Sequence, residues 1–170
     1  MSGMIVQGQP RNNAFENQQL MNMAMDYTLK NDKNPQSAAE SYSVVIADDD
    51  RTMADLLATN LRRLGHKVAG IAANGKEAVD LAIKTRPDVL IMDTHMPVLD
   101  GLNAAREILA TRNIPIVLST GMSDTRSLNR AVDLNVISYL VKPFSPAQLK
   151  VAIHLAVAQC RGIDKAEAAA

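Results

Sequence analysis

PDVLIMDTHMPVLDG, residues 87–101, is the stretch around which the predicted fold is built. Its apolar run at 89–92 follows a proline, a pattern typical of a strand buried on both faces, as in parallel sheets. The run ends on Asp93, and open α/β sheets bind ligands in the crevice at the carboxyl ends of their strands. Asp100-Gly101 then predicts a turn before a helix. Two interpretations of Asp93 stay open at this point: a side chain that only caps the strand end, or a reactive group.

The chain from residue 42 onward alternates between buried strands and helices. Predicted strands cover residues 44–47, 68–72, 88–93, 116–119 and 136–141, and a helix is predicted after each of them. Two capping-box patterns, Asn74 to Glu77 and Ser145 to Gln148, mark the starts of the second and the last helix. Five strands joined by helices over short connections predict an α/β fold with a doubly wound parallel sheet.

The composition changes at about residue 42. Residues 1–41 are rich in Asn and Gln, with Gly and Pro interruptions, and form an N-terminal extension that is either disordered or holds one helix near 13–30. Residues 42–161 form one domain, and 162–170 form a short C-terminal tail rich in Ala. The single cysteine, Cys160, has no partner for an internal disulfide, which suits a reducing compartment.

Composition and charge argue against several classes of function. The chain has 18 basic and 18 acidic residues, so it lacks the basic field that binds nucleic acid non-specifically. No apolar run approaches the roughly 20 residues that span a bilayer, and the N-terminus lacks the order of a signal peptide. We therefore expect a cytoplasmic protein that neither binds nucleic acid nor enters a membrane.

Charged and hydroxyl side chains follow the predicted strands where each strand ends. Acids 48–50 follow the first strand, Asp93 ends the third, Thr120 ends the fourth and Lys142 ends the fifth. Each of these residues, taken alone, also has a purely structural interpretation; the acids at 48–50, for example, could complement the dipole of the following helix. Carboxylates a few ångströms apart repel by about 1–4 kcal/mol per pair, and oxygen ligands suit Mg²⁺. Together these residues predict a phosphoryl site with Asp93 as nucleophile, Thr120 as hydrogen-bond donor and Lys142 as counter-charge.

Four motifs carry a resemblance to a known family: VVIADDD at 44–50, PDVLIMDTHMPVLDG at 87–101, IPIVLSTG at 114–121 and YLVKPFSPAQL at 139–149. Over about residues 42–161 the chain resembles the receiver (CheY-like) domain of bacterial two-component response regulators. The resemblance implies a flavodoxin-like (βα)5 fold with strand order 2-1-3-4-5. It also implies a phosphorelay function, in which a histidine kinase or a histidine phosphotransfer protein donates the phosphoryl group.

The resemblance assigns a metal site. Asp93 matches the family's phosphoacceptor, and Asp48 and Asp49 match its acidic pair. Together with the backbone carbonyl of His95, these residues would bind Mg²⁺. The family implies a signalling receiver that catalyses only its own phosphorylation and dephosphorylation, and not an enzyme with another substrate.

The resemblance also assigns a switch. Thr120 and Lys142 match the family's switch hydroxyl and lysine, Tyr139 matches its aromatic switch, and the bond from Lys142 to Pro143 is expected to be cis. Phosphorylation would remodel the face made by the family's helix 4, strand 5 and helix 5. That face would then control a downstream effector protein or form a homodimer.

The last helix carries a second apolar stripe, which we expect on its outer side. The stripe comprises Val151, Leu155 and Ala158. It predicts an interaction surface for a dimer mate, an effector or the N-terminal extension, although small aliphatic residues are also tolerated on surface helices. His66 and His154 are predicted to lie on the surface.

Two other functions remain as alternatives. Asp48 and Asp50 also fit the first motif of haloacid-dehalogenase-type phosphatases, as nucleophile and general acid. That family needs a later acidic pair for its metal, and no such motif follows the fourth predicted strand. The second alternative is a receiver that shuttles the phosphoryl group onward to another protein.

Overall fold

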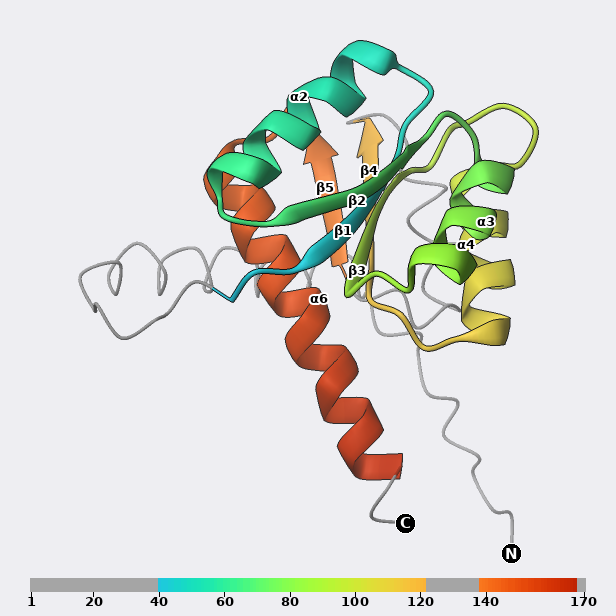
Figure 1. Ribbon diagram of the computed structural model, residues 1–170, viewed down its shortest axis with the longest axis vertical. Helices are drawn as coiled ribbons and strands as arrows, with labels where there is room; N and C mark the ends of the chain where they lie inside the picture. Colours follow the sequence, from blue (N-terminus) through green and yellow to red (C-terminus); the bar gives the residue numbers. More distant parts are fainter. Residues whose placement is uncertain (1–39, 122–137, 168–170) are drawn as a thin grey trace, which may run out of the picture.

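The computed structural model describes residues 40–121 and 138–167. Its strands are β1 (Ser43–Ala47), β2 (Lys67–Ala72), β3 (Val89–Asp93), β4 (Ile116–Gly121) and β5 (Ser138–Lys142). Neighbouring strands pair in parallel in the order β2-β1-β3-β4-β5. The sheet therefore confirms the predicted flavodoxin-like order 2-1-3-4-5 (Figure 1).

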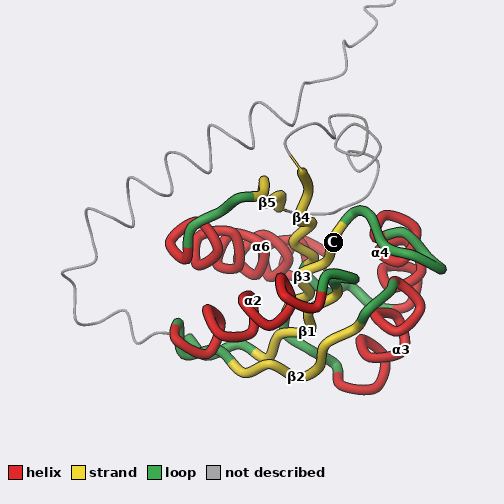
Figure 2. Tube along the Cα trace, turned by 90° about the horizontal axis from the view of Figure 1, so that it is seen from above, coloured by secondary structure: helices red, strands yellow, loops and turns green. Residues whose placement is uncertain are grey.

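The described helices are α2 (Arg51–Arg63), α3 (Gly75–Thr85), α4 (Gly101–Thr111) and α6 (Pro146–Glu167). Seen from above in Figure 2, α2 and α6 cover one face of the sheet, and α3 and α4 cover the other. The helices predicted near 13–30 and 123–135 lie outside the described residues. None of the described helices combines the length and the apolar character that crossing a bilayer requires.

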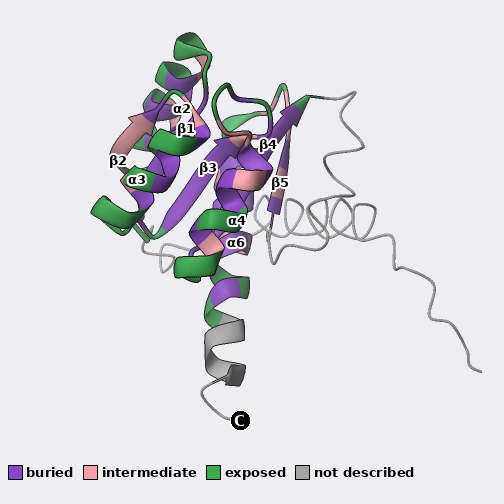
Figure 3. Cartoon of the chain, turned by 90° about the vertical axis from the view of Figure 1, so that its right-hand side faces the viewer, coloured by how far each residue is buried: buried purple, intermediate pink, exposed green. Residues whose placement is uncertain are grey.

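Successive side chains of each strand point to opposite faces of the sheet, and this divides the core into two layers. Val44 and Ile46 of β1 belong to the layer beneath α2 and α6. Val45 of β1, with Leu90 and Met92 of β3, belongs to the layer beneath α3 and α4. Because both faces are covered, β1, β3 and β4 are buried almost throughout (Figure 3), and this explains their continuous apolar sequences.

Side-chain caps fix where the helices begin. The Glu77 amide donates to Asn74 Oδ1 (2.9 Å), and the Ala73 amide donates to Glu77 Oε2 (2.8 Å). At α6, the Gln148 amide donates to Ser145 Oγ (3.2 Å), and the Ser145 amide donates to Gln148 Oε1 (2.8 Å). Both predicted capping boxes are confirmed, and each satisfies backbone donors that a helix start leaves open.

Helix α6 differs from the prediction in its length and in its buried side. It continues to Glu167, beyond the predicted end near residue 161, and extends past the sheet in Figure 1. Val151, predicted on the outer stripe, is only 4% exposed and lies in the core layer that α6 shares with α2. The prediction is wrong for Val151, because α6 packs beside α2 as well as on the sheet and so buries a wider sector. Leu155 is half-buried against the same layer, and Ala158 is exposed.

His66 is buried, which contradicts its predicted surface position. Its ring stacks on Tyr42 with the centroids 5.4 Å apart, and its Nδ1 accepts the Tyr42 amide proton at 3.3 Å. The half-buried His154 of α6 meets the Tyr42 ring edge-on. Burial, reinforced by the charges of His154 and Lys150, holds the pKa of His66 below its usual value. The sequence around residue 66 carries no sign of this contact, because Tyr42 and α6 come from distant parts of the chain.

Candidate functional site

The candidate site lies at the carboxyl ends of β1, β3, β4 and β5. The strand register places Asp93 beside Ser119 and Gly121 beside Lys142. Asp48 follows β1 directly, and its amide donates to the carbonyl of Ala72 at the end of β2 (3.1 Å). The parallel topology therefore gathers the side chains that the sequence predicted, although they are separated by up to 94 residues in the chain.

Lys142 joins the buried Asp48 and the partly buried Asp93. Its Nζ donates to Asp48 Oδ2 at 2.9 Å and to Asp93 Oδ2 at 2.5 Å. The other carboxylate oxygens accept backbone protons, from Asp50 to Asp48 Oδ1 (3.0 Å) and from His95 to Asp93 Oδ1 (3.0 Å). This pairing offsets the cost of holding two carboxylates close together in a partly buried place.

Burial and pairing act against each other on the pKa values of this cluster. Burial raises the pKa of Asp48 and outweighs the opposing effect of its hydrogen bond and attraction to Lys142. For Lys142, burial lowers the pKa, but the hydrogen bonds to Asp93 and Asp48 raise it by a larger amount. The net shift of the Lys142 pKa is therefore upward. Lys142 therefore stays a cation throughout the physiological pH range.

A divalent cation fits the carboxylates of Asp48, Asp49 and Asp93. Each offers one oxygen, and these oxygens all lie within 4.8 Å of one another. Asp48 is buried, Asp93 is intermediate and Asp49 is exposed, so the group is anchored in the sheet and open to solvent on one side. An all-oxygen set of this kind, open to water, matches the preference of Mg²⁺.

Asp50 serves a different purpose from its two neighbours. Its side chain is the N-cap of α2 and accepts the amide protons of Thr52 (2.8 Å) and Met53 (3.3 Å). The third acid of the predicted triplet is therefore committed to starting the helix.

Two glycines bring the loop after Asp93 close to its surroundings. A Cβ at Gly101 would lie 2.0 Å from the carbonyl oxygen of Asp93, and one at Gly75 would lie 2.2 Å from the carbonyl oxygen of Leu99. Instead, the Gly101 amide donates to the Thr94 carbonyl and the Gly75 amide donates to the Leu99 carbonyl, each at 3.1 Å. Close backbone approach of this kind requires the absence of a side chain.

Val98 lies in the same loop in an unfavourable conformation. Its φ is 69°, in the left-handed region, and its side chain is 84% exposed. A β-branched residue is disfavoured there by the contact between its Cβ and the backbone. The loop that follows the phosphoacceptor candidate therefore contains a strained residue on its outer surface.

The other predicted residues occupy neighbouring positions. Thr120 is fully buried at the end of β4, one residue beyond the partner of Asp93. Tyr139 of β5 is half-buried against the α3–α4 layer, and burial raises its pKa to about 12. The bond between Lys142 and Pro143 is cis, as expected. Sequence reasoning gave no role to Ser119, whose buried Oγ has no hydrogen-bond partner in the described part of the chain.

Comparison with known proteins agrees with this geometry. Residues 44–154 match the family described as "Response regulator receiver domain". The chain is 44% identical over 130 residues to the transcriptional regulatory protein PdtaR of Mycobacterium tuberculosis, a match that covers 76% of this chain and 63% of PdtaR. It is 36% identical over 110 residues to the probable transcriptional regulator ycf27 of Guillardia theta, covering 65% of this chain and 43% of that protein.

Solved structures show the same likeness. The signal receiver domain of a modulated diguanylate cyclase from Desulfovibrio desulfuricans G20 superposes with a TM-score of 0.67 at 33% identity, covering 72% of this chain and 98% of that one. A putative response regulator from Chloroflexus aurantiacus superposes with a TM-score of 0.65 at 31% identity, covering 70% and 99%. The chain spans less than two thirds of the length of the curated relatives named above.

Proposed function

The chain belongs to the response regulator receiver domain family, and from that premise we propose that it accepts a phosphoryl group on Asp93. The donor would be the phosphohistidine of a histidine kinase or of a histidine phosphotransfer protein. One observation carries the proposal: Asp93 shares a cluster with two acids whose oxygens lie within 4.8 Å and with the ammonium group of Lys142 at 2.5 Å. Formation of an aspartyl phosphate needs this combination of a carboxylate nucleophile and positive charge.

The chemistry is a single displacement at phosphorus. An oxygen of Asp93 forms a bond to phosphorus as the phosphorus–nitrogen bond of the donor breaks, and the bonding electron pair returns to the imidazole nitrogen, which takes up a proton. Lys142 offsets the negative charge on the phosphoryl oxygens. Asp48, Asp49, Asp93 and the carbonyl of His95 would hold Mg²⁺, which supplies further charge neutralisation at those oxygens.

The output would follow from movement of residues beside Asp93. Thr120, next to the register partner of Asp93, would hydrogen-bond the phosphoryl group. Tyr139, half-buried on the neighbouring strand, would change its position in response. The face formed by β5 and α6 would then bind a downstream effector or a second copy of the chain, and the family's helix 4, predicted near 123–135, lies outside the described residues. Leu155 and Ala158 are the members of the predicted stripe that this surface could still use.

A receiver accounts for this site better than the phosphatase alternative. In the alternative, Asp50 would serve as a general acid, but its carboxylate accepts two amide protons at the start of α2. Lys142 also pairs with Asp48, the nucleophile that the alternative requires. A receiver is typically a non-enzymatic signalling module, and we propose that its own phosphorylation and dephosphorylation are the reactions it performs.

Phosphorylation by a small phosphodonor tests the proposal. With Mg²⁺ and acetyl phosphate, intact-protein mass spectrometry should detect one added phosphoryl group, which hydroxylamine removes because it is an acyl phosphate. Asp93→Asn should abolish the addition, whereas Asp80→Asn, which removes an exposed carboxylate on α3, should leave it unchanged. Multiple-turnover phosphatase activity that survives Asp93→Asn and is lost with Asp48→Asn would overturn the proposal.

A further inference from the structure

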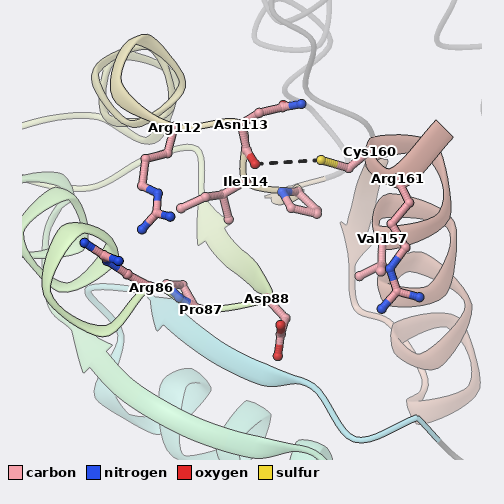
Figure 4. A pocket seen from close by; sticks show the side chains of 10 residues that line it. Arg86, Pro87, Asp88, Arg112, Asn113, Ile114, Val157, Cys160 and Arg161 are labelled. Carbon is pink, nitrogen blue, oxygen red and sulfur yellow. Dashed lines mark hydrogen bonds between the residues drawn. The ribbon is translucent and has the colours of Figure 1, made fainter. Parts of the chain in front are cut away.

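A second concave site lies at the opposite end of the sheet from Asp93. A cavity of about 220 Å³ opens between the ends of α3 and α4 and the side of α6, where β3 and β4 begin (Figure 4). Asp88, in its wall, precedes Asp93 by the length of β3, which at about 3.3 Å per residue is roughly 17 Å. The cavity is therefore separate from the carboxylate cluster.

Positive charge dominates the wall of this cavity. Three of its ten lining residues are arginines and one is an acid, which gives a formal charge of 3 − 1 = +2. The charged residues are Arg86, Arg112, Arg161 and Asp88. In Figure 4, Arg86 and Arg112 lie on the α3–α4 side of the cavity, and Arg161 comes from α6 on the other side.

Two of the four charged side chains already have partners. Arg161 pairs with Glu40 at 3.3 Å and lies over the ring of Tyr42. Asp88 accepts the amide proton of Ser43 through Oδ2 at 2.7 Å, which ties it to the start of β1. In the described part of the chain, neither residue forms an ion pair with Arg86 or Arg112, and Asp88 keeps its negative charge in the cavity wall.

Arg86 and Arg112 differ from Arg161 and Asp88, because their guanidinium groups make no hydrogen bond or ion pair with the described residues. Basic side chains near helix ends often bond the last carbonyls and complement the dipole, but neither of these arginines makes such a bond to the described part of α3 or α4. The wall therefore holds two like charges that repel each other and that no ion pair with the described residues offsets.

Arg86 also has a costly backbone conformation. It caps α3 with φ 49° and ψ 59°, in the left-handed region, and its amide donates to Ala82. Glycine or asparagine normally occupies such a cap, because a larger side chain is strained there. Strain of this kind persists where the surrounding structure fixes the backbone conformation, and the side chain of Arg86 lines the cavity.

From this arrangement we infer that the cavity binds a small organic phosphate. A phosphate monoester presents three terminal oxygens, so it can take the planar guanidinium groups of both Arg86 and Arg112, whereas one carboxylate is matched by one such group. The rest of the wall includes Pro87, Ile114 and Val157, which provides an apolar surface for the organic part of the ligand. The volume is below that of pockets for drug-sized molecules, so the ligand is small.

Calorimetric titration of the full chain with phenyl phosphate tests the inference. Divalent cations are removed by EDTA, so that the carboxylate cluster repels phosphate. Phenyl phosphate should bind at one site and should bind tighter than inorganic phosphate or succinate, because only it has both the phosphoryl oxygens and an apolar ring. Arg86→Gln and Arg112→Gln should each weaken binding about tenfold or more, the loss of one charge-assisted bidentate contact.

Arg62→Gln is the matched control, since Arg62 is also exposed in the last turn of a helix, α2, and does not line the cavity. It should leave the affinity unchanged. Both cavity arginines are exposed, so their variants should keep the melting temperature of the parent protein. Absence of saturable binding, or binding that Arg62→Gln weakens as much as Arg86→Gln does, would overturn the inference. Binding of succinate as tight as that of phenyl phosphate would overturn the assignment to phosphate.

Discussion

Gly101→Ala should both destabilise the protein and slow phosphorylation of Asp93. The added Cβ would lie 2.0 Å from the Asp93 carbonyl oxygen and 2.9 Å from its carbonyl carbon, where real Cβ contacts essentially never fall below 3.0 Å. The backbone would have to separate by roughly 1 Å, the difference between 2.0 and 3.0 Å. The atom that must move belongs to the main chain of the residue that carries the reacting carboxylate.

The size of both effects follows from that displacement. Overpacking a tight site costs about 1–3 kcal/mol, and we expect the upper end because main-chain atoms cannot turn away as a side chain would. For a domain of this size, about 3 kcal/mol corresponds to a fall of roughly 10 °C in melting temperature. A reacting group misplaced by about 1 Å loses on the order of 100-fold in rate, which should appear in the phosphorylation rate with acetyl phosphate and Mg²⁺.

Gly121→Ala is the control for this experiment. Gly121 ends β4 beside Lys142, close to the same site, but a Cβ there would meet no described atom within 4 Å. Its melting temperature and phosphorylation rate should match those of the parent protein. If Gly101→Ala melted within about 2 °C of the parent and were phosphorylated at the same rate, the close approach of Gly101 to Asp93 would be refuted.

Three further predictions follow from particular residues. Val98→Asn should raise the free energy of unfolding in urea by about 1 kcal/mol, since asparagine tolerates the left-handed conformation; an equal gain with Val98→Ala would point to another cause. Burial lowers the pKa of His66, so the unfolded chain binds more protons below about pH 6.5, and stability that is complete above this pH is lost as the pH falls. His66→Asn, whose side-chain oxygen can still accept the Tyr42 amide proton, should flatten this dependence in thermal melts, and an unchanged slope would contradict the assignment. Lys142→Met leaves the carboxylate cluster without its cation, so Mg²⁺ should raise the melting temperature of the variant more than that of the parent, and equal shifts would disprove this.

The sequence predicted the features that depend on neighbouring residues or on topology alone. The capping boxes at Asn74 and Ser145 involve residues three apart, so their pattern is visible locally. The cluster around Asp93 was predicted from four strand ends, because a parallel sheet with helical connections brings its carboxyl ends together whatever fills the loops. Lys142 was placed correctly for the same reason.

Features made by contacts across the chain escaped prediction. Val151 and His66 look like surface residues in their own segments, and only the packing of α6 beside α2, and of Tyr42 on His66, buries them. The left-handed cap at Arg86 also has no local signal, because the sequence has neither Gly nor Asn there. Tertiary packing overrides local preference at Val151 and His66.

Helix α6 has the geometry of a lever. Its 22 residues, at about 1.5 Å each, make a rod of roughly 33 Å, and its first residue, Pro146, lies four positions after Lys142 in the chain. A tilt of about 10° at that end would carry the far end about 6 Å sideways over a rod of this length. A small rotation of α6 at Pro146 would thus displace Glu167 by about the pitch of one helical turn.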